Sequence, residues 1–467
     1  MQTPTADLVD TGYLRESRFI DRRDRDQQGA LVLETAVGLT PHGLVQHPVL
    51  FSGQVLRPDV AAGGLRSLVE IASTRYFNPI PGGFASLDPI VTAQGDRLRC
   101  EAFSACNGVY ARLDLLGQSL DERALGFGTT NIDINPLLAL ALAGIAQHEP
   151  LHLQVGPEQI TFAMPGGQHT ERKVALPERW VRALAETQCL ASGMVLRAEL
   201  DGMAWRRFAQ GLSTAGGNGA GTSLWVVPSP GGLRQTRRPQ RGAVALNGTA
   251  RLSAIRRLQH LVQRVRMYGP EVSESTPSAI GVWEFQLPGA RLSLMLSPEP
   301  YRGFSGEGAV LASLGRADNA DAQTLSALLA WEPCIDPAAL AQEAQLPVDR
   351  VGHALTVLAT SGQVGFDLHE QRYFHRQLPF GEDRVRHNYP RLEAAKKLVA
   401  DGAVSTQADR HRVEGEHGTY WVVPHQGRLQ CTCLFEAKYS GTRGPCKHAL
   451  AVHLFTGLPA VGGADAR

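Results

Sequence analysis

The spacing of apolar residues divides the N-terminal third of the chain into strands and helices. Alternation over residues 31–35 predicts a strand, and alternation returns over residues 100–115. Between them, apolar positions at three- and four-residue intervals over residues 61–75 predict a helix. Asn135 directly precedes Pro136, a pair typical of a capped helix start. This third therefore mixes α and β elements.

The middle of the chain continues the mixture without the regular β-α-β alternation of a parallel sheet. Residues 151–164 predict two strands joined at Gly156–Pro157, and residues 177–188 predict a helix. Alternation over residues 283–296, interrupted by Pro288–Gly289, predicts a hairpin with one buried face. Because glycine and proline breaks are frequent, we expect an antiparallel α+β fold.

A different pattern follows, in which three short helices precede two strands. Residues 325–331, 337–344 and 348–360 predict the helices, with Asp336 as an N-cap, and residues 364–374 predict the strands. This order is that of a winged helix-turn-helix, a module that contacts DNA or protein. If the third helix were the recognition helix, we would expect these residues to be exposed: Asp349, Arg350, His353 and Thr356.

Composition is that of a folded protein with several domains. The chain has 467 residues, of which 43% are hydrophobic and 19% charged. The net charge of +1 excludes a globally cationic protein, so any basic surface must be local. The longest apolar run, residues 137–146, is shorter than the ~20 residues of a membrane span and predicts a core helix. The polar N-terminus has no apolar signal region, so we expect a cytoplasmic protein.

Three of the seven cysteines gather near the C-terminus, in the pattern Cys431-x-Cys433, a twelve-residue interval, then Cys446-x-His448. Two cysteines at i and i+2 on a strand point to the same side, and Cys446 and His448 stand where an apolar helix begins. Three thiolates and one imidazole form a closed tetrahedral set for Zn²⁺, which predicts a structural site without an open position for water. The alternative is three buried free thiols and a surface histidine. The interval (LFEAKYSGTRGP) favours a flexible loop.

This CxC…CxH spacing resembles the SWIM zinc finger position for position. Stretches such as NGVYARLDLL, GTTNIDINP and RGPCKHALAVHLF make most of the chain similar to a family of bacterial SWIM zinc finger proteins. The resemblance implies a DNA- or protein-binding module. It also implies partners among AAA+ ATPases and von Willebrand A-type proteins, and therefore an adaptor role in their assembly.

The patterns together predict five parts in an α+β, multidomain chain. Residues 1–28 form a polar arm and residues 29–149 an N-terminal α+β region. Residues 150–320 form a middle α+β domain, and residues 321–385 a winged-helix-like module. Residues 386–467 form the SWIM zinc finger module.

Residues 202–270 of the middle domain contain eleven arginines and no acidic residue. Apolar positions from Leu252 to Val265 recur at helical spacing, which leaves several arginines off the apolar face. Arginine forks bind phosphates bidentately, so we expect a nucleic-acid surface. The alternatives are ion pairs with acids elsewhere in the fold or an acidic protein partner. The predicted phosphate contacts are Arg234, Arg237, Arg238, Arg241, Arg256, Arg257 and Arg264.

Catalytic patterns are weak. Cys106 beside Asn107–Gly108 has no histidine and aspartate around it in a recognisable pattern, and it is typical of a buried core thiol. Asp133 and Asn135 are more typical of turns and caps than of ligands. We therefore expect a non-catalytic binding protein. An enzyme with an unrecognised site remains the alternative, and a cleft that holds Cys106 or Asp133 beside a histidine would favour it.

Overall fold

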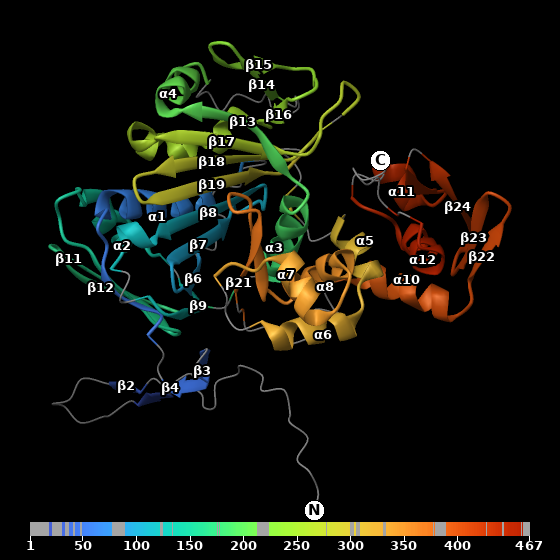
Figure 1. Cartoon of the computed structure of the whole chain (residues 1–467), viewed down its shortest axis with the longest axis horizontal. Helices are drawn as coiled ribbons and strands as arrows, with labels where there is room; N and C mark the ends of the chain where they lie inside the picture. Colours follow the sequence, from blue (N-terminus) through green and yellow to red (C-terminus); the bar gives the residue numbers. More distant parts are fainter. Residues whose placement is uncertain are drawn as a thin grey trace, which may run out of the picture.

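The computed structural model describes residues 49–76, 89–212, 224–298, 303–329, 333–376 and 389–460, apart from short gaps within these ranges, and four short strands before residue 47. Several antiparallel sheets and their helices make the α+β class expected from the sequence (Figure 1). The C-terminal module lies beside the main body, next to the helices of residues 309–360 (Figure 1). Among the described residues, no helix combines the length and apolarity that crossing a membrane requires.

The main body is built on one eight-stranded antiparallel sheet. Strand β19 pairs with β8 from Ala290↔Leu115 to Leu296↔Val109, so strands on both sides of residue 150 share this sheet. The hairpin predicted at Pro288–Gly289 is present, as β18 and β19. In sheet order the strands are β13 (Val195–Asp201), β17 (Arg264–Gly269), β18 (Gly281–Leu287), β19 (Ala290–Leu296), β8 (Val109–Leu116), β7 (Arg97–Phe103), β6 (Ile90–Gln94) and β9 (Phe127–Asn131).

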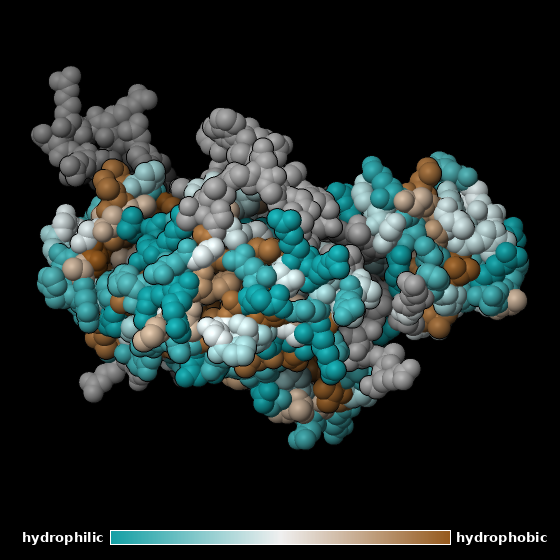
Figure 2. Space-filling view, turned by 90° about the horizontal axis from the view of Figure 1, so that it is seen from above, coloured by the Kyte–Doolittle hydropathy of each residue, from teal (hydrophilic) through white to brown (hydrophobic). Residues whose placement is uncertain are grey.

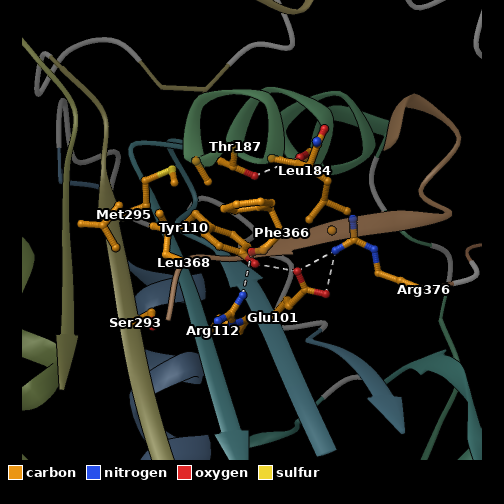
Figure 3. Close-up of a pocket in the computed structure, with 14 residues that line it drawn as sticks. Glu101, Tyr110, Arg112, Leu184, Thr187, Ser293, Met295, Phe366, Leu368 and Arg376 are labelled. Atoms are coloured by element: carbon orange, nitrogen blue, oxygen red, sulfur yellow. Dashed lines mark hydrogen bonds and ion pairs between the residues drawn. The ribbon is translucent and has the colours of Figure 1, made fainter. Parts of the chain in front are cut away.

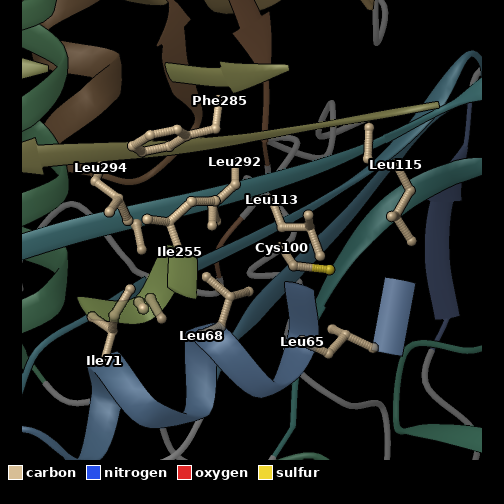
Figure 4. Close-up of a cluster of buried hydrophobic side chains, with 14 of the residues drawn as sticks. Leu65, Leu68, Ile71, Cys100, Leu113, Leu115, Ile255, Phe285, Leu292 and Leu294 are labelled. Carbon is tan, nitrogen blue, oxygen red and sulfur yellow. The ribbon is translucent and has the colours of Figure 1, made fainter. Parts of the chain in front are cut away.

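Helix α1 (Pro58–Ser73) and the 3-10 helix η4 (Thr249–Leu261) cover one face of this sheet with apolar side chains (Figure 4). Leu68 of α1 and Leu113 of β8 are fully buried there. Gly64 permits this close contact, because a Cβ at that position would lie 2.7 Å from Leu113. The helix predicted over residues 61–75 is therefore confirmed, and its apolar side forms the core.

The opposite face of the sheet is also covered, by helix α3 (Glu178–Ala191) and the hairpin β20 (Val364–Asp367)–β21 (Arg372–His375) (Figure 1). Every residue of β19 is buried, so the prediction of one buried face was wrong. The sequence had suggested a solvated face because charged residues alternate with apolar ones along these strands. On the face that α3 and the hairpin cover, Arg291 of β19 and Arg112 of β8 each bond to Asp367 of the hairpin at 3.0 Å. Asp367 therefore takes the place of solvent as the partner of these two buried arginines.

Smaller sheets flank the large one. The strands predicted over residues 151–164 are β10 (His152–Val155) and β11 (Gln159–Met164), in a sheet of order β12-β11-β10-β5 with β5 (Phe51–Gln54) and β12 (Gly167–Arg172). A second sheet, of order β15-β14-β16, lies beside helix α4 (Gly202–Gln210) and contains β14 (Trp225–Ser229), β15 (Gly232–Thr236) and β16 (Val244–Ala245). The N-terminal strands are β1 (Arg18–Ile20), paired with β2 (Ala30–Val32), and β3 (Val37–Thr40), paired with β4 (Gly43–Gln46).

The apolar run at residues 137–146 does not form the predicted core helix. Helix α2 (Pro136–Ala141) ends after six residues and continues as a short 3-10 turn. Leu137 and Leu140 are 70% and 72% exposed, whereas Leu138 is buried. The predicted cap is present, because Asn135 accepts hydrogen bonds from the backbone N–H groups of Leu137 and Leu138.

Helices α6, α7 and α8 precede the β20–β21 hairpin, in the order expected for residues 321–376, and α5 comes before them. Helix α8 packs against α3, α5, α6 and α7. Thr356 is buried, which corrects the expectation that it faces solvent, whereas Asp349 and Arg350 are exposed as expected and His353 is half-buried. The exposed guanidinium of Arg350 pairs with Asp321. The helices are α5 (Ala309–Arg316), α6 (Asn319–Leu328), α7 (Pro337–Ala344) and α8 (Val348–Thr360).

The C-terminal module combines a four-stranded antiparallel sheet with three helices. Helix α12 packs against α10 and against α5 of the preceding helices. The elements of the C-terminal module are α10 (Pro390–Ala400), β22 (Val404–Gln407), β23 (Arg410–Gly415), β24 (Gly418–His425), β25 (Arg428–Cys431), α11 (Leu434–Tyr439) and α12 (Lys447–Thr456).

Candidate metal centre and basic surface

The structure brings together the four residues that the sequence pattern selects. One ligand atom from each of Cys431, Cys433, Cys446 and His448 lies within 4.8 Å of the others, and all four residues are buried. The sequence pattern predicts that these four side chains converge, and the structure places them together, so the cluster could hold a metal ion.

Three of the ligands lie at helix N-termini and not on a strand: Cys433, Cys446 and His448, which is in the first turn of α12. Cys431 ends β25, but Cys433 caps helix α11, and its Sγ accepts the backbone N–H of Glu436 at 3.5 Å. Cys446 caps α12 in the same way, with its Sγ 3.3 Å from the backbone nitrogen of Ala449. The expectation that both cysteines of the CxC pair lie on one strand was therefore wrong. N–H groups and the positive end of a helix both favour a thiolate.

Electrostatics within the cluster favour a thiolate at Cys433. Hydrogen bonding from Cys431, and then from Cys446, lowers the pKa of the Cys433 thiol. The pKa values of the Cys431 and Cys446 thiols are raised, so the arrangement favours the deprotonated sulfur that metal ligation requires at one of the three cysteines.

His448 faces the thiols through one ring nitrogen. Its Nδ1 lies 3.7 Å from the Sγ of Cys431, close to the ~3.6 Å that a tetrahedral zinc ion sets between sulfur and nitrogen ligands. The Tyr420 ring stacks on the imidazole, with 4.0 Å between centroids and 18° between planes. The ring orientation is therefore fixed by packing, and the four donors fit a soft, tetrahedral ion.

The residues between the two ligand pairs are more ordered than predicted. Half of this interval forms helix α11, so the prediction of a flexible loop was wrong for residues 434–439. Glu436 of α11 is buried and accepts a 2.7 Å hydrogen bond from Arg428 on β25. Arg391 donates to the carbonyl oxygens of Arg443 and Pro445, which holds the chain just before Cys446.

The arginines of residues 202–270 divide into exposed and engaged groups. Arg257 pairs with Glu70, and Arg264 lies on strand β17 and pairs with Glu199 at 2.5 Å. The predicted helix from Leu252 to Val265 is the shorter 3-10 helix η4, and Val265 belongs to β17, because the sheet edge takes up these residues. The predicted phosphate contacts that are exposed and have no ion pair among the described residues are Arg234, Arg237, Arg238, Arg241 and Arg256.

A polar cleft of about 570 Å³ lies between strand β13, helix α4 and the turn of the β14–β15 hairpin. Arg197 and Arg207 line it, together with Glu199 and Asp201. Both acids are engaged: Glu199 pairs with Arg264 and Arg266, and Asp201 accepts the N–H groups that begin α4. Seen from above, the side of α4 and the hairpin, the surface is mainly hydrophilic (Figure 2).

A second cavity lies on the inner face of the sheet, beneath α3 and the β20–β21 hairpin (Figure 3). Its volume of about 30 Å³ is room for one water molecule. Its charged groups are already paired, because Arg376 bonds to both oxygens of Glu101 at 2.6 and 2.7 Å and Tyr110 donates to the same carboxylate. The cavity is therefore part of a structural contact.

The buried charges of this interface are what the sequence reasoning missed. Asp367 is 1% exposed and bonds to Arg99, Arg112 and Arg291. Burial alone would raise the pKa of Asp367, but the three guanidinium groups hold it well below its usual range. The available signal was the alternation of charge and apolarity in RLRCE and YARLD, typical of strands with one charged face.

Of the residues considered for catalysis, Cys106 and Asn135 lie in the part of the chain that the structure describes. Cys106 is half-buried at the turn between β7 and β8, and so is not the fully buried core thiol expected. Asp133 lies outside the described residues. Two histidines near the cysteine–histidine cluster have partners outside it. His411 bonds to the hydroxyl of Thr406, and His453 bonds to the carbonyl oxygens of Leu458 and Ala312.

Comparisons with known proteins identify no family. No protein-family model and no curated protein matches the chain. Among solved structures, proliferating cellular nuclear antigen from Entamoeba histolytica matches at 12% identity and a TM-score of 0.34, over 54% of this chain and 100% of that one. The PCNA2–PCNA3 complex from Sulfolobus tokodaii matches at 9% identity and a TM-score of 0.36, over 53% and 99%. No functional argument rests on a likeness of this size.

Proposed function

We propose that the chain is a non-catalytic SWIM-type zinc protein that binds nucleic acid through the arginines around its β14–β15 hairpin. The observation that carries the proposal is the set of exposed arginines with no ion pair among the described residues. The zinc-binding part of the proposal is supported by the four-ligand cluster, because its donors match a closed zinc site.

The metal would act on the fold and not on a substrate. With three thiolates and one imidazole bound, Zn²⁺ has no position left for water or substrate. The ligands join β25, α11 and α12. The ion would therefore hold the C-terminal module together.

The arginine surface suits phosphates better than an internal role. Arg234 lies on β15, and Arg237, Arg238 and Arg241 follow within seven residues, all exposed. Arg207 of α4 faces the neighbouring cleft, whose two acids already have partners. Arginine forks bind phosphate oxygens bidentately, and a set of this kind positions a nucleic acid without reading its bases.

The test is a salt titration of binding to random duplex and to single strands. Replacing Arg237, Arg238 and Arg241 together by Gln should reduce the log–log salt slope on duplex by roughly two to three, since each phosphate contact contributes about 0.9. Arg264→Gln is the matched control, because this arginine of the same stretch is occupied by Glu199. If wild-type protein fails to bind at low salt, or if the triple variant keeps the full slope, the arginines are not a nucleic-acid surface.

A protein-adaptor function is the second candidate, favoured by exposed apolar side chains on the zinc module. Leu434 is 87% exposed and Phe455 is 49% exposed. Exposed apolar groups on a small module are typical of partner contacts. The resemblance to SWIM proteins implies an AAA+ ATPase or a von Willebrand A-type protein. Affinity purification with nuclease, comparing wild type with Leu434→Glu, distinguishes this case: a partner retained after nuclease and lost in the variant supports the adaptor.

A further inference from the structure

The buried guanidinium of Arg251 has no carboxylate partner among the described residues. Arg251 is 2% exposed, and its Nη1 donates to the backbone oxygen of Ser297 at 2.8 Å. Its Nη2 is buried and has no hydrogen-bond partner in the part of the chain that the structure describes. A buried charge without a counter-charge is costly, and burial lowers the pKa of this arginine to about 10.

The half-buried thiol of Cys106 stands on the same side of a glycine as this guanidinium. A Cβ built on Gly108 would lie 3.4 Å from the Sγ of Cys106 and 3.6 Å from the Nη2 of Arg251. The absence of a side chain at Gly108 therefore leaves room for the two groups to approach one another. The turn is held in place, because Asn107, with φ of 54°, donates from its side-chain amide to the oxygen of Phe304 at 3.1 Å.

We propose that Cys106 is a reactive thiolate, paired with the buried guanidinium of Arg251, and that it is a site of oxidation by hydroperoxides.

Charge balance favours the thiol as the counter-ion. The other acidic group near Arg251 is the phenol of Tyr76, whose pKa is raised by burial and next by the charge of Glu70. Glu70 is itself paired with Arg257. Cysteine is intrinsically more acidic than tyrosine, so the proton leaves Cys106 first. A partly exposed thiolate beside a cation is the environment of a reactive cysteine.

The oxidation is balanced as follows. The Cys106 sulfur attacks one oxygen of the hydroperoxide, the S–O bond forms and the O–O bond breaks. Sulfur loses two electrons and becomes a sulfenic acid, while the second oxygen leaves as hydroxide or alkoxide and takes up a proton. Only the thiolate attacks efficiently, which is why the pairing with Arg251 matters.

The test uses the full-length, zinc-loaded protein, pulsed with iodoacetamide between pH 5.5 and 9.5 and followed by mass spectrometry of each cysteine peptide. Cys334 is the matched control: it is exposed, and burial near its sulfur raises the pKa of its thiol. Cys106 should be alkylated at least tenfold faster than Cys334 at pH 6.5, with a midpoint at least one pH unit lower. An equal or higher midpoint for Cys106 overturns the proposal.

Two variants assign the effect to the guanidinium. Arg251→Met should move the Cys106 midpoint up to that of Cys334, whereas Tyr76→Phe should leave it unchanged. An unchanged midpoint in folded Arg251→Met overturns the pairing; if this variant does not fold, the wild-type comparison with Cys334 decides. Hydrogen peroxide followed by dimedone should label Cys106 and spare Cys334. Equal labelling, or none at Cys106, overturns its role in oxidation.

Discussion

Removal of one ligand from the cysteine–histidine cluster tests the metal centre most directly. In Cys433→Ser the buried thiolate that caps α11 is replaced by a hydroxyl, which keeps the backbone cap but is a poor zinc ligand. Metal binding in small zinc modules is worth on the order of 10–16 kcal/mol. Shared equally by four ligands, this is about 2.5–4 kcal/mol each, or roughly a hundred- to a thousand-fold in affinity.

The expected result is close to one Zn²⁺ per chain in the wild type and loss of most of it in Cys433→Ser and His448→Ala. Metal content by mass spectrometry and thermal unfolding by calorimetry measure the two consequences. The C-terminal module should unfold first on chelation, because its ligands join β25, α11 and α12. The eight-stranded sheet has its own apolar core, so a second transition should remain.

Cys334→Ser is the control, because this exposed cysteine is outside the cluster. Its metal content and first transition should match the wild type. Full metal retention in Cys433→Ser would refute the ligand assignment. Loss of metal in both serine variants would instead indicate an unspecific effect of thiol removal.

Three further predictions concern the main body. Leu68→Ala, at the contact of α1 with the sheet, should lower the free energy of unfolding by about 2–5 kcal/mol in urea titrations, since Leu68 is fully buried; loss below about 1 kcal/mol would contradict its place in the core. Asp367→Asn should cost about 3–5 kcal/mol by removing one of the two buried carboxylates shared by Arg99, Arg112 and Arg291 and leaving Asp114 alone to balance them, whereas Glu393→Gln, from an exposed pair with Lys396, should cost less than about 1 kcal/mol. Burial lowers the pKa of His375 to about 4, below its usual 6.5, so the unfolded state binds the proton more readily and stability should fall between pH 6.5 and 4 by about 3 kcal/mol; His375→Gln should lose this pH dependence, and an unchanged profile would count against the burial.

Local features of the fold follow from sequence because they depend on neighbours in the chain. The hairpin at Pro288–Gly289 needs only a turn between alternating runs, and Gly289 adopts the required φ of +70°. The helix starts at Asn135 and Asp336 need only a capping side chain before a proline, and both caps are present. Such signals are complete within a few residues.

Features that depend on distant segments could not be predicted in this way. The burial of Thr356 in α8 could not be predicted from residues 348–360 alone, because it depends on the packing of α5 against this helix. The apolar face of residues 252–265 was correct for Leu252 and Leu258, but its end was set by β17, which pairs with β18 over Arg264↔Gln286 to Tyr268↔Val282. Tertiary pairing overrode helical spacing there.

The cysteine–histidine cluster shows the same division within one site. The candidate ligands could be recognised in the sequence because metal chemistry restricts the residue types, and the structure brings Cys431, Cys433, Cys446 and His448 together. The contacts that hold the ligands in place could not be predicted from the spacing. Helix α11 forms within the interval because Cys433 caps it, and its buried Glu436 is paired with Arg428. A thiol that caps a helix serves two functions at once, since the N–H groups that favour the helix also favour the thiolate. The metal site and the two helices that carry it should therefore form together, and neither should be stable in this module without the other.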